Sequence, residues 1–287
     1  MDKVTEGLAK RLKSQPLVQK VSPDMKAEEL PDGVYSGMSD EDYNKIEALR
    51  STESKCFVNW KGETFPGKYY ANYIYKPFKV MKDEVTGEKD VFVIGNKVHE
   101  KVLFGTTDFN THPKIFKEGA ATRIKNRNTV DLCASSLLAR PLFRNLLEGS
   151  YRELVVIVTC PATGLRLKAK MDIVDSDLQT ITDIKTTGNL SELTTTADWK
   201  SGFLNYGYPI QEQHYLYCAN LAFGDPLFGA ERKMIFAAVE KGKDYDVEFL
   251  QTDADKREGY HAIFHNALKE LAMRKKSNNW FDQIKII

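Results

Sequence analysis

Alternation of apolar and polar residues marks the middle of the chain as rich in β-strand. Over residues 165–175 apolar side chains fall on every second position, the pattern of a half-buried strand. One face would carry Leu165, Leu167, Ala169, Met171 and Ile173, and the other Arg166, Lys168, Lys170 and Asp172. A Val- and Ile-rich run over 153–161 predicts the preceding strand. Residues 180–187 predict the following strand, after a turn rich in Asp and Ser.

Segments with the residue spacing of helices precede and follow these strands in the sequence. Ser39, followed by acidic residues, predicts the start of a helix, and apolar residues recur at helical spacing over 95–104. A further helix has Pro209 in its first turn and Gly224 just beyond its end. Two more strands and a last helix are predicted over 233–240, 247–250 and 253–275. The fold class is therefore α/β (α+β), with a central mixed β-sheet flanked by helices.

The N-terminal region differs from the rest of the chain. Residues 1–30 are polar, show weak apolar periodicity and are interrupted by prolines. We therefore expect a flexible arm over 1–30 and a single folded domain over 31–287.

Composition narrows the class of protein. Hydrophobic residues make up 42% and charged residues 28%, values of a globular chain rather than a disordered or fibrous one. The formal net charge of +1 excludes a uniformly basic nucleic-acid coat, so phosphate contacts would need a local patch. The best candidate for such a patch is the basic cluster Lys114, Lys117, Arg123, Lys125 and Arg127.

The sequence also bears on the cellular compartment. No stretch approaches the roughly 18 consecutive apolar residues that a membrane span needs, and the opening residues lack the apolar core of a signal peptide. The four cysteines are far apart and form no C-x-x-C pair, which argues against a zinc ribbon or clustered disulfides. We expect a reduced, cytoplasmic compartment and no membrane partner.

Two aspartates and a lysine form the strongest candidate for chemistry. Asp183 and Lys185 are two positions apart and would project from one strand face. If 165–175 and 180–187 form a hairpin, Asp172 lies opposite Asp183, with Cβ atoms roughly 5 Å apart. Such a pair repels unless a cation lies between, and Mg²⁺, which takes oxygen ligands at about 2.1 Å, fits the gap. Lys185 would then orient water or stabilise charge on a phosphoryl oxygen, as phosphodiester hydrolysis requires.

Each piece of this pattern is weak alone. The acidic-x-Lys triplet also occurs at 24–26 and 198–200, where nothing else suggests a site. Gln211 and Tyr215 are four apart and share a helix face, as many structural pairs do. His99 lies beside an apolar helical stripe, where a histidine is more often part of the core than a ligand. Only the occurrence of all these residues in one order along the chain indicates a functional site.

In that order the residues resemble the PD-(D/E)xK nuclease superfamily, in its RecB-type branch with the Q-x-x-x-Y motif. More narrowly they resemble the phage and prophage RecE-type exonucleases (exonuclease VIII). The segments that carry the resemblance are 33–43, 95–99, 168–172, 182–187 and 208–215, with the motif core at about 95–225. The resemblance implies a restriction-endonuclease-like core.

The resemblance also implies a role for each motif position. Asp172, Asp183, the main-chain carbonyl of Ile184 and His99 would bind the metal, Mg²⁺, for which Mn²⁺ could substitute. Lys185 would be the catalytic lysine. Gln211 and Tyr215 would position it or contact the DNA strand, and Glu153 would support the site.

The implied activity is that of a metal-dependent exodeoxyribonuclease. It would degrade linear double-stranded DNA from its ends, 5′→3′, leaving 3′ tails for a single-strand annealing recombinase. The chain would be a subunit of a homo-oligomeric ring, a trimer or tetramer, in the cytoplasm of a bacterial host. Two alternatives are a nuclease-fold module that binds DNA without cutting it and a RecB-like nuclease with another end preference. An iron–sulfur nuclease is disfavoured, because no cysteine follows Cys218.

Overall fold

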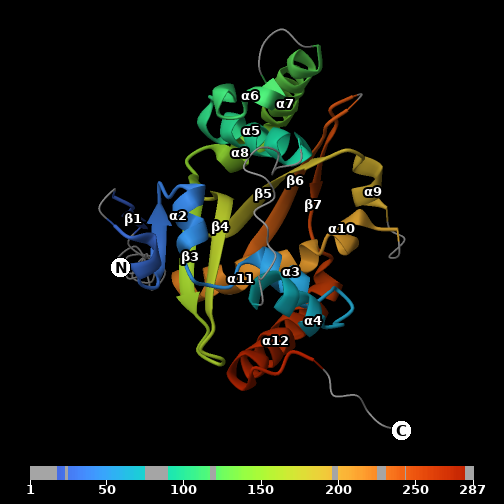
Figure 1. The fold of residues 1–287 in the computed structure, drawn as a ribbon. Coiled ribbons are helices and arrows are strands. Elements are labelled where there is room, and N and C mark those ends of the chain that lie inside the picture. Colours follow the sequence, from blue (N-terminus) through green and yellow to red (C-terminus); the bar gives the residue numbers. More distant parts are fainter. Residues whose placement is uncertain are drawn as a thin grey trace, which may run out of the picture.

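A computed structural model of the chain describes residues 18–22, 25–74, 90–116, 121–195, 200–224, 231–242 and 244–281. At its centre is a seven-stranded sheet whose strands lie side by side in chain order (Figure 1). Strands β1 and β2 are parallel, as are β5 and β6, and the other neighbours are antiparallel. The strands are β1 (Val18–Lys20), β2 (Gly33–Ser36), β3 (Tyr151–Thr159), β4 (Arg166–Val174), β5 (Thr180–Thr187), β6 (Lys233–Glu240) and β7 (Val247–Leu250).

Helices flank this sheet, which confirms the predicted α/β architecture with a mixed sheet. The longer ones are α5 (Asp90–Phe104), α7 (Ala121–Ala139), α11 (Tyr208–Phe223) and α12 (Ala254–Ser277). Shorter helical segments are η1 (Ala27–Glu29), α2 (Asp40–Lys45), α3 (Ser51–Phe57), α4 (Pro66–Tyr69), η2 (Tyr70–Ile74), η3 (Phe109–Thr111), α6 (Pro113–Phe116), α8 (Pro141–Leu147), α9 (Leu190–Thr194) and α10 (Gly202–Asn205).

The two faces of the sheet carry separate cores. On one face α3, α11 and α12 pack over the strands in a large cluster that includes Leu167, Leu216 and Phe264. On the other face α5 and α7 form a second cluster with Val98 and Ile184. In Figure 1, α5 and α7 lie at the top of the view, α3 and α11 lie over the lower part of the strands, and α12 lies at the bottom. Residues of β5 contribute to both cores, so this strand is covered on both sides.

Local signals in the sequence explain several element boundaries. The Ser39 side chain accepts a hydrogen bond from the N–H of Asp42 at 3.0 Å and caps α2 as predicted. Helix α11 has proline in its first turn and Gly224 at its C-cap, also as predicted. The bounds of β5, β6 and β7 coincide with the predicted ranges. No element is predicted from the sequence over 121–147, where the structure has α7 and α8.

The alternation of β4 is interrupted at Asp172. Met171 packs in the larger core, but Ile173 lies in the second core and Val174 returns to the first. The prediction that Ile173 shares a face with Met171 is therefore wrong. On β3, Glu153 has φ +49°, and the Glu153–Asp172 pair is missing from an otherwise continuous register. The change of face on β4 therefore lies directly beside the left-handed residue of β3, where the two strands do not pair.

Part of the expected N-terminal arm belongs to the sheet. Val18–Lys20 forms β1 and pairs in parallel with β2. Ala27 and Leu30 are buried, in a small cluster with Tyr35. Residues 18–22 and 25–30 are therefore packed against the domain, and residues 1–17 lie outside the described residues.

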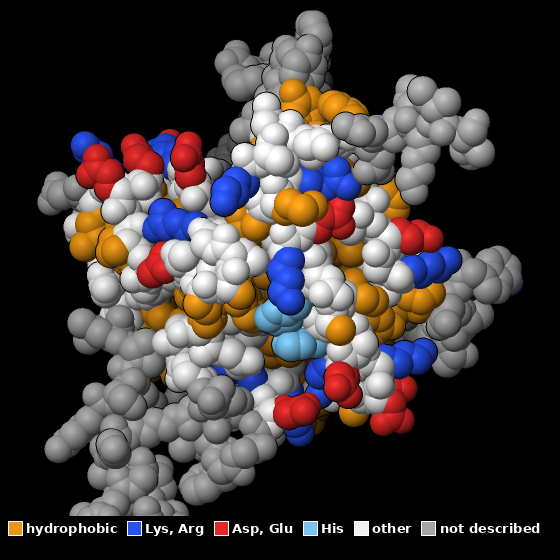
Figure 2. Space-filling model, turned by 90° about the horizontal axis from the view of Figure 1, so that it is seen from below, with side chains coloured by type: hydrophobic (Ala, Val, Ile, Leu, Met, Phe, Trp, Pro, Cys, Tyr) orange, Lys and Arg blue, Asp and Glu red, His pale blue; other side chains and the backbone are white. Residues whose placement is uncertain are grey.

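The surface seen from below carries mixed charge. Figure 2 shows basic and acidic side chains interspersed on this face, in keeping with the formal net charge of +1. All four cysteines are free thiols. None of the helices in the described ranges has the length and apolarity needed to cross a bilayer.

Candidate active site

Strands β4 and β5 form a hairpin that opens at the two aspartates. Ile173 pairs with Thr182 and Val174 with Ile181, the register that places Asp172 opposite Asp183 at the next position. Beyond that point the Asp172 carboxylate accepts a hydrogen bond from the N–H of Ile184 at 2.8 Å. The side chain thus occupies the edge of β5 to which a neighbouring strand would bond. The strands separate there, and both carboxylates border the gap.

Asp183 is nearly enclosed and is paired with the motif lysine. Its side chain is 5% exposed, and its Oδ2 lies 2.5 Å from the Nζ of Lys185. Within the described residues that oxygen has the ion pair but no hydrogen bond of good geometry. The Lys185 ammonium also lies over the ring of Tyr208, 5.1 Å from its centroid, and this ring stacks on Phe236.

Helix α11 binds both strands that carry the aspartates. Gln211 donates its side-chain N–H to Asp183 Oδ1 at 2.8 Å, which ties the helix to β5. Tyr215, one turn later, donates its hydroxyl to the carbonyl of Lys170 at 2.9 Å, which ties the helix to β4. The four-residue spacing therefore lets one helix face hold the open hairpin at a set width. Neither side chain has a described contact with Lys185, the partner that the resemblance implied.

The residue before Tyr215 extends this anchoring to α3. His214 has no exposed surface, and its two ring nitrogens lie 3.0 Å from the hydroxyl of Ser54 and 3.0 Å from the carbonyl of Lys168. A carbonyl only accepts hydrogen bonds, so Nε2 carries the proton and Nδ1 accepts from Ser54. Burial lowers the pKa of His214 to about 4, so the ring is neutral at physiological pH.

His99 reaches the site from the opposite face of the sheet. Its Nδ1 lies 3.3 Å from Asp172 Oδ2. Helix α5 comes close to β5 at Gly95, where a Cβ atom would lie 2.9 Å from the Thr186 hydroxyl. Because His99 follows Gly95 by one helical turn, this close approach sets the distance of the imidazole from Asp172.

Glu153 lies beside the aspartates without joining them. Its carboxylate is 3.1 Å from the ammonium of Lys170, which also pairs with Asp40 at 2.6 Å. Burial raises the pKa of Glu153, although Lys170 acts in the opposite direction. This arrangement suits the supporting role that the resemblance implied, which stays a prediction.

The two aspartates differ in their electrostatic environments. Burial raises the pKa of Asp183, and the nearby Asp172 adds to this, although Lys185 opposes both. Burial also disfavours the charge on Asp172, but His99 and the N–H of Ile184 lower the pKa of its carboxyl. Burial likewise works against the charge on His99 and Lys185, yet the neighbouring aspartates raise the pKa of both. The site is a tightly coupled set of two carboxylates and two cationic groups.

The donor set at the gap fits a hard divalent cation. Asp172 and Asp183 supply carboxylate oxygens, and Asp183 Oδ2 is buried without a hydrogen bond. The N–H of Ile184 points to Asp172, so the carbonyl of this strand residue faces the same edge. In the described part of the chain no three His, Cys, Asp or Glu side chains form a ready-made metal cage. Mg²⁺ does not need one, because it commonly binds one or two carboxylates and retains several waters.

Two arginines of the predicted basic cluster form hydrogen bonds to main-chain carbonyls of the fold. Arg123 donates to the carbonyl of Lys114 at 3.0 Å, and Arg127 donates to that of Phe116 at 2.7 Å, so both cap the end of α6. Lys114 and Lys125 are exposed, and Lys117 lies outside the described residues. A contact of this cluster with DNA stays a prediction.

Lys55, a lysine of α3 that no sequence motif marks, also reaches the site. Its ammonium donates to the Gln211 side-chain oxygen at 3.2 Å and lies 5.6 Å from the centroid of the Tyr208 ring. No spacing rule connects it to the motif, because it precedes Gln211 by 156 positions. Only the packing of α3 against α11 brings it to the aspartates.

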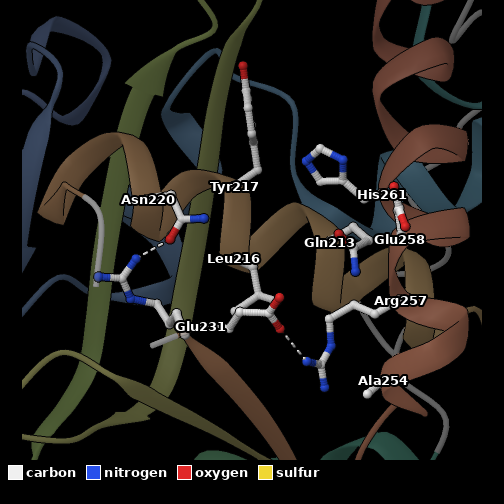
Figure 3. A pocket seen from close by; sticks show the side chains of 10 residues that line it. Gln213, Leu216, Tyr217, Asn220, Glu231, Ala254, Arg257, Glu258 and His261 are labelled. Carbon is white, nitrogen blue, oxygen red and sulfur yellow. Dashed lines mark hydrogen bonds and ion pairs between the residues drawn. The ribbon is translucent and has the colours of Figure 1, made fainter. Parts of the chain in front are cut away.

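A separate cavity of about 410 Å³ lies on the other face of α11, toward α12 (Figure 3). Gln213 and Tyr217 line it, about half a helical turn away from Gln211 and Tyr215. Across it, Arg257 pairs with Glu231 at 3.0 Å. The cavity is therefore distinct from the gap that the aspartates border.

A family model for a "PDDEXK-like domain of unknown function (DUF3799)" matches residues 78–283. The chain belongs to this family. The match covers the hairpin, α5 and α11, and so agrees with the predicted PD-(D/E)xK superfamily. Within this DUF3799 chain, Lys55 and the rest of α3 precede the matched region.

Comparison with solved structures finds one fold of clear similarity among the two described here. The crystal structure of a putative exonuclease from Eubacterium rectale has a TM-score of 0.61 and 15% identity, over 87% of this chain and 91% of that chain. The crystal structure of a phage related exonuclease from Haemophilus somnus 129PT has a TM-score of 0.31 and 13% identity, over 80% of this chain and 96% of that chain. No curated protein matches the chain. The first of these likenesses shows a shared fold.

Proposed function

We propose that this DUF3799 chain is a metal-dependent exodeoxyribonuclease that hydrolyses linear double-stranded DNA from its ends. The observation that carries the proposal is the open hairpin, where Asp172 and Asp183 border one gap and Lys185 lies 2.5 Å from Asp183. Two carboxylates and an ammonium at one point are what hydrolysis of a phosphodiester by water requires. The name of the similar Eubacterium rectale structure, a putative exonuclease, agrees with it.

The residues of the chain would divide the chemistry among them. Asp172, Asp183, the carbonyl of Ile184 and His99 would hold Mg²⁺, for which Mn²⁺ could substitute. When bound, the ion would supply positive charge that polarises the phosphate and lowers the pKa of a water. Lys185 would release Asp183 and place its ammonium beside the attacking water or the phosphoryl oxygen. Gln211 would keep Asp183 oriented through its bond to Oδ1.

The finer features of the proposal rest on the resemblance to RecE-type exonucleases. They are 5′→3′ polarity, 3′ tails passed to a single-strand annealing recombinase, and assembly into a homo-oligomeric ring in a bacterial cytoplasm. Each of these features can be tested apart from hydrolysis itself.

The direct test uses purified protein and linear duplex labelled at the 5′ or the 3′ end. We expect loss of duplex with Mg²⁺, none with EDTA, and survival of closed circular DNA. Asp183→Asn and Lys185→Ala should each lower the rate by about 10³-fold or more. Asp177→Asn, on the exposed hairpin loop, should leave the rate unchanged and serves as the matched control.

Three results would contradict the proposal. Undiminished digestion by Lys185→Ala or by Asp183→Asn would show that the hydrolysis arises elsewhere. Nicking of closed circles at a rate comparable with linear duplex would make the protein an endonuclease. Binding of DNA without hydrolysis under any metal would favour the non-cutting alternative.

A further inference from the structure

Lys55 is held by the first turn of α11. Its side chain lies against Gly207, where a Cβ atom would come within 3.0 Å of the Lys55 Cδ. Gly207 has φ +71°, so the position suits glycine on two grounds. The ammonium then lies over the ring of Tyr208 and donates to Gln211 at 3.2 Å. Three residues at the start of one helix thus form a cradle for this lysine.

Lys55 differs from the other lysines near the site because it forms no ion pair with any carboxylate that the structure describes. Lys185 pairs with Asp183 at 2.5 Å, and Lys170 pairs with Asp40 and Glu153. Among the described carboxylates none forms an ion pair with Lys55, whose polar partner is a neutral amide. Burial and the nearby Lys185 lower the pKa of Lys55 to about 8, so the ammonium is retained at neutral pH. A mostly buried cation with no direct ion pair is costly, and binding of an anion beside it would offset that cost.

The surroundings of Lys55 add further positive potential. Helix α11 is 16 residues long, so its N-terminus carries a substantial partial positive charge. The N-cap, Gly207, has no side chain to accept hydrogen bonds from the first turn, in which Pro209 has no N–H. Two ammonium groups and a helix N-terminus converge there, and Asp183 is the acidic group that faces them. Such a combination favours a phosphate.

We infer that Lys55 and the first turn of α11 form a phosphate-binding subsite beside the Asp183–Lys185 pair, which takes a backbone phosphate of the DNA strand being cut. This rests on the proposed function, because it assigns the substrate contact of the same site. Gln211 bonds to Lys55 and to Asp183 through the two ends of one amide. A phosphate held by Lys55 is therefore coupled to the orientation of Asp183.

The first test measures DNA binding without catalysis. A short labelled duplex is titrated with the full chain in EDTA, from 50 to 200 mM salt, for wild type, Lys55→Ala, Lys55→Arg and the control Lys61→Ala. Loss of one charge-assisted contact predicts about tenfold weaker binding for Lys55→Ala. The slope of log K against log salt should become shallower by about one, with Lys55→Arg and Lys61→Ala near wild type. Unchanged affinity and slope in Lys55→Ala would overturn the subsite.

The second test separates phosphate contact from mere support of Gln211. Duplexes carrying one neutral methylphosphonate at successive positions near the end are digested by wild type and Lys55→Ala. At the contacted position wild type should lose about tenfold in kcat/KM, whereas Lys55→Ala should lose nothing more. Independent losses at every position would show a structural role and overturn the inference. Hydrolysis that is absent in wild type, with the binding difference intact, would instead refute the nuclease and leave the subsite standing.

Discussion

The carboxylate of Asp172 accepts the N–H of Ile184 at 2.8 Å, a position in the sheet that a main-chain carbonyl would ordinarily fill. A side chain therefore completes the edge of β5 at the point where β4 departs from it. The bond has two consequences: it fixes the carboxylate at the gap, and it satisfies a backbone donor that would otherwise be unpaired.

This double role predicts different outcomes for two substitutions of Asp172. Asparagine keeps an oxygen that can accept the hydrogen bond from the N–H of Ile184. Asp172→Asn should therefore unfold at nearly the wild-type urea concentration while losing the hydrolysis of DNA. Ala leaves the N–H unpaired, so Asp172→Ala should lose about 1–3 kcal/mol of unfolding free energy as well. Equal stability of the two variants would show that the bond to Ile184 contributes nothing.

The close approach of α5 to β5 predicts that Gly95→Ala destabilises the protein. Alanine favours a helix by about 1 kcal/mol over glycine. The added Cβ would, however, lie 2.9 Å from the Thr186 hydroxyl, on a stiff β-branched side chain, and such overlap costs about 1–3 kcal/mol. We therefore expect a net loss of up to about 2 kcal/mol in urea denaturation.

Two further variants check this explanation. Gly259→Ala, in α12 with open space around its Cβ position, should gain about 0.5–1 kcal/mol. Gly95→Ala should become neutral or stabilising when measured against a Thr186→Ala background, because the overlapping hydroxyl is gone. Persistence of the loss in that background would place its cause elsewhere.

The bond from Tyr215 to β4 predicts a stability effect beyond lost packing. Tyr215→Phe keeps the ring but leaves the carbonyl of Lys170 without its 2.9 Å partner, which should cost about 1–3 kcal/mol. Tyr206→Phe, on a ring that is 48% exposed, should stay within about 0.5 kcal/mol. Chemical denaturation of both variants measures the difference. A Tyr215→Phe protein as stable as Tyr206→Phe would rule out this anchoring role.

Neutral His214 predicts a loss of stability in mild acid. Its pKa is about 4 in the folded protein and near 6.5 when unfolded, so the unfolded chain binds the proton more readily. Stability contributed by the neutral ring is complete above pH 6.5 and should fall by about 3 kcal/mol as pH drops to 4. Unfolding free energies of wild type and His214→Gln at several pH values isolate this contribution. Parallel curves for the two proteins would contradict it.

The parts of the site that depend on local spacing along the chain could be predicted from the sequence. The contacts that depend on the packing of distant segments could not. The register that sets Asp172 against Asp183 follows from a short turn and a period of two. The shared helix face of Gln211 and Tyr215 follows from their spacing. The hydrogen-bond partners of these two side chains do not follow from spacing. The Lys170 carbonyl that binds Tyr215, for example, is 45 positions away and has no sequence signature.

Other differences between sequence and structure have similar causes. Ile173 lies on the other face from Met171, next to Asp172, whose partner position on β3 is the left-handed Glu153. Neither the change of face nor the left-handed glutamate has a signature in the sequence, since glycine is the residue that usually marks a positive φ. Strand β1 has three residues, too few for a visible alternation. Helix α7 escaped prediction because its first half is largely exposed, and its five buried residues begin only at Thr129.

Helix α3 has a consequence for how the protein can be divided. It precedes residues 78–283, yet Ser54 holds His214 and Lys55 holds Gln211. A fragment of residues 78–283 would retain both aspartates. It would leave the side chains of His214 and Gln211 without their partners on α3. Transplanting the motif-bearing region into another protein would therefore demand that this seven-residue helix travel with it.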